Sequence, residues 1–326
     1  MRPPPVLLVA VAIAAAAVTF AVTRVASSPS SPPAVHAALP PSAASYLGVY
    51  EAGSPPDYDP IAGFAQAAGG QPNIAAYFSG WAQPFAASFA EKIRSDGVIP
   101  FVQIDPTYAS VAGIASGDYD DYLRSYADSV RDFGHAVVIG FGHEMNGPWY
   151  PWGYGHVPAS TFVAAWRHIV SLFRAQGADN VTWLWTVNQD RSGTGPVASW
   201  WPGADYVTWV GIDGYYFRPS DTFAGVFGRT IDQVRAFTNK PVLLSETAVG
   251  PDAGQYTEIG DLFVGMHKYN TLGLVWFDKT QDQGIYQQDW RIENSQSAEA
   301  ALRLGVSGLA LARPEIAPGR RQWRTW

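Results

Sequence analysis

Eight short runs of β-forming residues, spread from Tyr46 to Asp278, constrain the fold of this chain more than any other feature. They are rich in Val, Ile, Trp and Tyr, and several are almost continuously apolar, which is typical of parallel strands covered on both faces. The predicted runs are Tyr46–Tyr50, Asn73–Phe78, Val98–Asp105, Val137–Glu144, Val181–Asn188, Tyr206–Tyr215, Pro241–Glu246 and Gly273–Asp278.

Helical patterns lie between these runs. Residues 118–133 place their apolar side chains on one stripe, and residues 161–175 do the same, with Ser160 as the predicted N-cap. Residues 84–95 and 222–237 are also helical by pattern, although glycine interrupts the second. Eight strands that alternate with helices predict a (β/α)8 TIM barrel, in the α/β class.

The predicted barrel is a single catalytic domain that spans residues 46–312, with no internal repeat and no second domain. In this fold, sites form at the C-terminal ends of the strands. Glu144 ends the fourth run and Glu246 ends the seventh. Strands 4 and 7 lie across the barrel mouth from each other, so both carboxylates are expected to face one small volume.

The first 37 residues read as an export segment. Arg2 precedes an apolar run over residues 6–22, and a Ser/Pro-rich stretch leads to small residues that end at Ala37. Cleavage after Ala37 predicts a secreted, extracellular protein. The run is also almost long enough to span a bilayer, so an uncleaved membrane tether through residues 6–22, with an extracytoplasmic barrel, is the alternative.

Composition excludes several partner classes. The formal net charge is −7, and loss of Arg2 and Arg24 with the export segment would change it to −9. This balance argues against a nucleic-acid partner, which requires a basic surface, and is compatible with a neutral polysaccharide. The chain has no Cys, which excludes disulfides and thiolate chemistry. Residues 313–326 are expected to be a disordered tail.

Residues 142–153 carry the strongest chemical signal. Glu144 follows an apolar run, His143 precedes it, and Trp149, Tyr150 and Trp152 come soon after. Aromatic rings stack on pyranose faces, and an acid beside them can move a proton. With Glu246 as a second carboxylate, the chain has the pair that glycoside hydrolysis requires. Burial and like charge should raise the pKa of the acid, while hydrogen-bond donors keep the nucleophile ionised.

Other residues at strand ends are candidates for contacts with the sugar. His143 does not begin a zinc motif, because position 147 is Gly rather than a second His, so no metal and no cofactor are expected. Tyr215 could donate to the nucleophile. The remaining substrate-binding candidates are His143, Trp149, Asn188, Asp213 and Trp276, with Trp276 as the predicted floor of the cleavage subsite; Gln103 and Asp105 are weaker candidates.

The segment from His143 to Gly153 resembles the acid/base signature of glycoside hydrolase family 26, a clan A family of barrels dominated by β-mannanases. Further matches follow in the family's order at residues 201–207, 213–215 and 245–246, and then at Trp276. The resemblance covers roughly residues 46–304. The first motif is long and specific, whereas Ser-Glu at 245–246 is weak alone.

This resemblance implies Glu144 as the acid/base and Glu246 as the nucleophile of a retaining endo-β-glycanase. It also implies that His143, Trp149, Tyr215 and Trp276 are site residues. One position departs from the pattern: β-mannanases of the family often carry Arg four residues before the acid/base, where this chain has Gly140. The departure leaves the catalytic pair intact but bears on the choice of sugar.

The sequence therefore predicts a hydrolase of β-linked polysaccharide. β-1,4-Mannan is the first expected substrate, and mixed-linkage β-1,3-1,4-glucan or β-1,3-xylan is the alternative. Two rival interpretations remain open at this point. One is a non-catalytic carbohydrate-binding protein on the same scaffold, and the other is an anchored cell-envelope enzyme that acts on the producer's own glycan.

Overall fold

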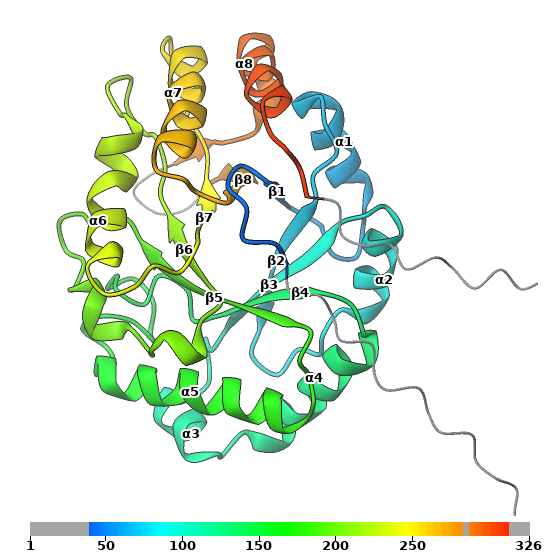
Figure 1. Ribbon diagram of the computed structural model, residues 1–326, viewed down its shortest axis with the longest axis vertical. Helices are drawn as coiled ribbons and strands as arrows, with labels where there is room; N and C mark the ends of the chain where they lie inside the picture. Colours follow the sequence, from blue (N-terminus) through cyan, green and yellow to red (C-terminus); the bar gives the residue numbers. More distant parts are fainter. Residues whose placement is uncertain (1–38, 283–286, 313–326) are drawn as a thin grey trace, which may run out of the picture. The chain divides into compact units, whose positions relative to one another are not determined.

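The computed structural model describes residues 39–282 and 287–312, which belong to one compact unit. Eight parallel strands close into a barrel in the order β1 to β8, and helices surround it (Figure 1). The (β/α)8 prediction is confirmed. The predicted export or anchor segment and the predicted C-terminal tail lie outside the described residues. Within the described residues, no helix is both long enough and apolar enough to cross a membrane.

The barrel strands agree with all eight predicted runs to within three residues at each end. The strands are β1 Tyr46–Glu51, β2 Ile74–Gly80, β3 Ile99–Asp105, β4 Val137–Phe141, β5 Val181–Asn188, β6 Trp209–Asp213, β7 Val242–Thr247 and β8 Gly273–Asp278. A short antiparallel pair, β9 Thr280–Gln281 and β10 Gln288–Asp289, follows β8. The predicted run 137–144 is too long, because β4 ends three residues before Glu144. The predicted run 206–215 also exceeds β6 at both ends.

In the part of the chain that the structure describes, eight α-helices pack outside the strands. They are α1 Asp59–Ala68, α2 Ala87–Ser95, α3 Val111–Ser116, α4 Asp120–Phe133, α5 Ala159–Ala175, α6 Arg229–Arg235, α7 Gln255–Lys268 and α8 Gln296–Ser307. Short helical turns also occur at η1 Val197–Trp200, η2 Ala204–Tyr206, η3 Ala224–Gly228 and η4 Ile292–Asn294. Helices α1, α3, α7 and α8 were not among the four predicted patterns.

Two helical predictions need correction. Ser160 is not the N-cap of α5, because that helix begins at Ala159 after Pro158, and no side chain caps it. Pro158 sets the extended entry into the helix. The predicted helix over 222–237 is divided into a π-helical turn, η3, and the short α6. Glycines 225 and 228 weaken the regular α-helical pattern there, and π turns of this kind occur inside otherwise α-helical segments.

Alternation along each strand separates two apolar layers. One set of side chains points into the barrel and fills its lower half, with Tyr46, Phe101, Leu184, Trp209 and Val275 among them. The opposite set points outward and packs against the helices in a much larger cluster. A side chain's strand position therefore decides whether it can reach the barrel mouth or lies in the wall beneath the helices.

The two ends of the described chain meet at the N-terminal ends of the strands. Asn73 Nδ2 donates to the carbonyl oxygens of Ser45 and Ala312, at 2.8 Å each. Leu39 is buried in the inner cluster. These contacts close one end of the barrel, and the C-terminal ends of the strands stay available for a site.

Candidate active site

Glu144 lies in a tight turn after β4. Its backbone has a φ of +53°, and its N–H donates to the carbonyl oxygen of Thr186 in β5 at 3.0 Å. A left-handed conformation costs a non-glycine residue about 1–3 kcal/mol and is concentrated at functional sites. The prediction that Glu144 ends a strand is therefore wrong in detail. The turn, rather than the strand, aims its side chain across the barrel mouth.

Two donors hold the Glu144 carboxylate. Trp149 Nε1 donates to Oε2 at 2.5 Å, and Asn188 Nδ2 donates to Oε1. Asn188 is the last residue of β5, and its side-chain oxygen has no hydrogen-bond partner among the described residues. Trp149 is 36% exposed, and the Arg191 guanidinium lies 4.7 Å from its ring centroid. Trp149 is thus both a donor to the acid and a partly open aromatic surface beside it.

Glu246 lies at the same level of the barrel as Glu144, on the opposite wall. It lies near the end of β7 and pairs in register with Asp213, which pairs in turn with Asn188. The Tyr215 hydroxyl donates to Glu246 Oε2 at 2.6 Å, whereas Oε1 is buried and has no partner in the described part of the chain. Tyr215, the predicted donor, thus forms its hydrogen bond with Glu246, the predicted nucleophile.

The environment of Glu246 raises its pKa to about 7. Burial is the main cause, and the Glu144 charge adds to it, whereas the His143 charge and the Tyr215 hydrogen bond oppose it. The two carboxylates therefore interact electrostatically. The sequence predicts a raised pKa at the acid/base and an ionised nucleophile, whereas burial raises the pKa of Glu246 itself. The His143 charge and the Tyr215 hydrogen bond limit this rise and favour the ionised form of Glu246.

Asp213 lies close to both glutamates and is paired in register with Glu246. It is 0% exposed, and its Oδ1 accepts a hydrogen bond from Ser245 Oγ at 2.6 Å. Burial, and then the charges of Glu246 and Glu144, hold the pKa of Asp213 well above its usual range. The predicted contact between Asp213 and a sugar hydroxyl is not supported, because the side chain is closed off from solvent. Asp213 instead interacts with the charges of Glu246 and Glu144.

His143 is engaged on both ring nitrogens. Nδ1 lies 3.0 Å from Asp105 Oδ1, and Nε2 lies 3.2 Å from the Tyr150 hydroxyl. Burial alone would lower the pKa of His143, but Asp105 and the two glutamates raise it to about 10. The predicted contact between His143 and the substrate is therefore not supported, because both ring nitrogens already have protein partners. His143 is instead a buried positive charge that lowers the pKa of Glu246, and Asp105 holds it there.

The prediction for Trp276 is wrong. Trp276 is 0% exposed, belongs to the outer cluster and donates its indole N–H to the Trp290 carbonyl oxygen at 3.0 Å. Alternation along β8 explains this, because Trp276 and Leu274 point outward. Phe277 points to the mouth instead, with its ring centroid 5.8 Å from that of Tyr215 and 4.7 Å from that of Tyr50.

Sequence reasoning missed several residues of the mouth. Tyr50 stacks on Phe277, Phe78 contacts both Tyr50 and His143, and Trp290 lies 4.9 Å from Tyr215. Strand alternation was the signal that could have found Tyr50, Phe78 and Phe277. Trp152, by contrast, was expected in the aromatic wall but is buried, with its N–H on the His143 carbonyl oxygen at 2.9 Å.

Gln103 fills the space above Gly140. The two residues pair in register, and a Cβ added to Gly140 would lie 1.9 Å from Gln103 Oε1. Gln103 is buried and donates to Thr186 Oγ1 at 3.1 Å. A long side chain at position 140 is therefore incompatible with Gln103 as placed, which explains how the chain accommodates glycine at this point.

Changing Gly140 to Ala is expected to lower the free energy of unfolding by about 1–3 kcal/mol, because the new methyl group overlaps Gln103. Chemical denaturation measures this change. In a double-mutant cycle with Gln103→Ala, the two substitutions should be coupled favourably. Additive effects in that cycle would contradict the packing described.

A family model confirms the relationship that this geometry suggests. The model described as glycosyl hydrolase family 26 matches residues 74–303. The chain belongs to glycosyl hydrolase family 26. Endoglucanase H of Acetivibrio thermocellus is 31% identical over 271 residues, which cover 78% of this chain and 29% of that protein. Beta-1,3-xylanase TXYA of a Vibrio species is 29% identical over 140 residues, or 42% of this chain and 29% of the relative.

The chain spans about three-tenths of the length of these two relatives. Among solved structures, Bacillus subtilis mannanase man26 superposes with a TM-score of 0.63 at 19% identity, and the match covers 86% of this chain and 90% of that one. At this identity the likeness establishes the shared barrel fold. Family 26 membership and the fold are thus established.

Proposed function

We propose that this family 26 protein is a retaining endo-β-glycanase. The observation that carries the proposal is the convergence of Glu144 and Glu246 at one barrel mouth, each held by aromatic hydrogen-bond donors. Two carboxylates with different hydrogen-bonding environments are what a double displacement requires. The same convergence argues against a non-catalytic carbohydrate-binding protein, because binding alone requires no such pair.

In the proposed reaction, ionised Glu246 attacks the anomeric carbon while the bond to the leaving oxygen breaks and Glu144 protonates that oxygen. The result is a covalent glycosyl-enzyme. Glu144, now ionised, then takes a proton from water as the water oxygen attacks the anomeric carbon and releases Glu246. Two inversions give overall retention. Tyr215 and His143 favour the ionised form of Glu246 for the first step.

The pH profile should respond to Tyr215. Because the Tyr215 hydrogen bond lowers the pKa of Glu246, Tyr215→Phe should raise that pKa, so less nucleophile is ionised at a given pH. The acid limb of kcat/KM is expected near pH 7 in the wild type and at higher pH in Tyr215→Phe, with kcat lowered about 10- to 100-fold.

Rates measured across pH test this expectation. Tyr216→Phe is the matched control, because the Tyr216 hydroxyl bonds to Asp261 rather than to Glu246. The control should leave the acid limb in place. An unmoved limb in Tyr215→Phe would separate Tyr215 from the ionisation of Glu246.

β-1,4-Mannan is the first proposed substrate, on the resemblance of the 143–153 motif to β-mannanases. Mixed-linkage β-glucan is the second, and two observations favour it: Gly140 with Gln103 replaces the arginine often found in the mannanases, and Endoglucanase H is 31% identical. β-1,3-Xylan is a third, because of the similarity to Beta-1,3-xylanase TXYA.

A substrate panel tests the proposal. Galactomannan, glucomannan, mixed-linkage glucan and β-1,3-xylan are incubated with the protein, and solution viscosity and product lengths are followed. An endo-glycanase should lower viscosity early and release oligosaccharides of several sizes from at least one of them. Release of monosaccharide alone would contradict endo action, and no cleavage of any of the four would contradict the proposed substrate class.

We also propose that the barrel acts outside the cytoplasm, with residues 1–37 as a cleaved export signal. The support is the apolar run of residues 6–22 and the Ser/Pro-rich stretch that follows. Mature protein in the medium, with an N-terminus near Ala38, is the expected result. Full-length protein in the membrane fraction would favour the anchored alternative, which acts on cell-envelope glycan.

A further inference from the structure

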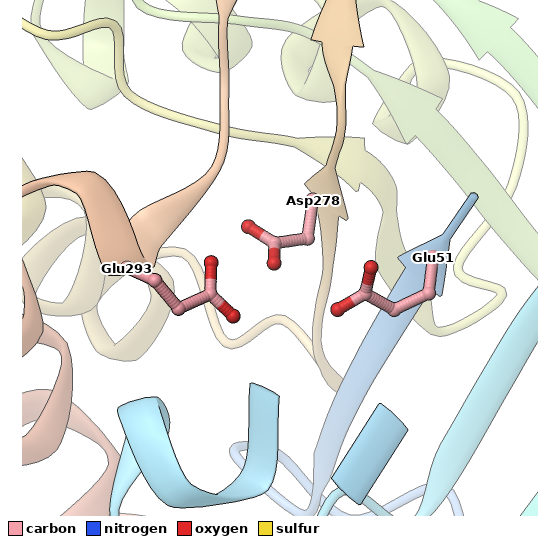
Figure 2. Close-up of side chains that lie close together, drawn as sticks. All are labelled: Glu51, Asp278 and Glu293. Carbon is pink, nitrogen blue, oxygen red and sulfur yellow. The ribbon is translucent and has the colours of Figure 1, made fainter. Parts of the chain in front are cut away.

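Three carboxylates gather behind the barrel wall, away from the catalytic pair. They belong to Glu51 at the end of β1, Asp278 at the end of β8, and Glu293 in η4, and they point toward one another (Figure 2). One oxygen from each lies within 4.8 Å of the others. Glu51 and Asp278 are paired in register on adjacent strands, and both point outward by strand alternation.

Glu51 is the unusual member of this acidic cluster. The residue is buried, with 9% exposure, yet among the described residues its carboxylate receives no hydrogen bond from any group outside the cluster. Asp278 is also buried and accepts one hydrogen bond, from the Ile292 N–H at 2.8 Å. A buried carboxylate aimed at two others is costly unless a cation or a proton compensates it.

Within residues 39–282 and 287–312, no side-chain cation forms an ion pair with the cluster, although the Arg291 charge interacts with Asp278 and Glu293 at longer range. Arg291 is the nearby candidate, but its guanidinium binds both oxygens of Asp289, at 2.8 and 2.7 Å. Other described basic side chains form ion pairs on helices, such as Arg94 with Glu91 and Arg124 with Asp120. Among the described residues, no basic side chain therefore forms an ion pair with Glu51, Asp278 or Glu293.

We propose that Glu51, Asp278 and Glu293 bind a divalent cation, with Ca²⁺ as the best match. Carboxylate oxygens are the ligands of hard cations. Ca²⁺–oxygen distances of about 2.3–2.6 Å place opposite ligands up to about 5 Å apart, which the observed spacing satisfies. Mg²⁺, at about 2.1 Å, would require a tighter group of oxygens and a regular octahedron.

The cation would join the segment after β8 to the end of β1. This segment carries Trp290, whose carbonyl oxygen accepts from Trp276 and whose ring lies against Tyr215, the donor to Glu246. The proposed site is therefore structural. It stabilises a connection that supports one wall of the active site, and it makes no contact with the catalytic carboxylates.

Thermal unfolding of the full chain tests the proposal. Protein treated with EDTA and then dialysed should gain about 5 °C in Tm when CaCl2 is added to a large excess over Kd, with a smaller gain from MgCl2. Equilibrium dialysis should find one Ca²⁺ per chain. Both measurements are independent of glycanase activity, so failure of the cation proposal would not count against the proposed function.

Glu293→Gln is the decisive variant, because Glu293 is exposed and its loss should not prevent folding. It should lose at least tenfold in Ca²⁺ affinity and most of the Tm gain, whereas Glu91→Gln, an exposed helix position paired with Arg94, should behave as wild type. An unchanged Tm with CaCl2, or an equal gain in Glu293→Gln, would overturn the proposal. A response to acidification alone would assign the compensation to a proton instead.

Discussion

Replacing Glu246 with Ala is expected to lower kcat roughly 10⁴-fold or more, because the variant has no group to form the covalent intermediate. Binding of an oligosaccharide that is a substrate of the wild type should stay within a few-fold. The substitution removes a carboxylate but leaves the aromatic residues of the mouth in place. Isothermal titration calorimetry measures the affinity, and reducing-sugar release measures the turnover.

The matched control is Glu91→Ala, an exposed glutamate on α2. It should retain the wild-type rate, which shows that a glutamate-to-alanine change as such is harmless. A fully active Glu246→Ala variant would remove the double-displacement mechanism. If neither the wild type nor the variant turns over any glycan but both bind one, the carbohydrate-binding interpretation would replace the enzyme.

Glu144→Ala is the second large expected effect. Loss of the general acid should lower kcat on polysaccharide about 10²- to 10⁴-fold. On an aryl glycoside with a good leaving group the first step needs little protonation, so the loss should appear mainly in the hydrolysis of the glycosyl-enzyme. Added azide, which needs no general base, should then restore turnover and give a glycosyl azide of retained configuration.

Steady-state and burst kinetics with the two substrates check this prediction. Asn188→Ala provides a graded comparison, because it removes only one donor to Glu144 and leaves the carboxyl in place. It should reduce the rate less than Glu144→Ala does. Equal losses on polysaccharide and aryl glycoside, with no effect of azide, would contradict the assignment of Glu144 as acid/base.

The barrel was predictable because strand composition and helix periodicity are local signals. Eight apolar runs, each long enough for a covered parallel strand, leave few alternatives. Strand ends were less predictable where a turn begins early. The turn at residues 142–144 follows β4 without any change in burial, and its left-handed backbone at Glu144 has no sequence signature apart from the neighbouring glycine.

The catalytic candidates were predictable because a carboxylate after an apolar strand is unusual and informative. The supporting residues were less so, since their roles depend on direction. Trp276 was predicted at the mouth, but alternation along β8 places it under the helices and gives that position to Phe277. Asp213 and His143 were found by position, whereas their burial depends on packing across several strands that sequence does not display.

The stereochemistry of the first product tests the central claim most directly. Proton NMR, recorded within minutes of adding enzyme to the preferred polysaccharide from the panel, distinguishes the α and β anomers before mutarotation mixes them. Glu246 as nucleophile and Glu144 as acid/base predict that the β anomer is released first. Initial release of the α anomer would contradict the account, because a single displacement by water would then have inverted the anomeric carbon.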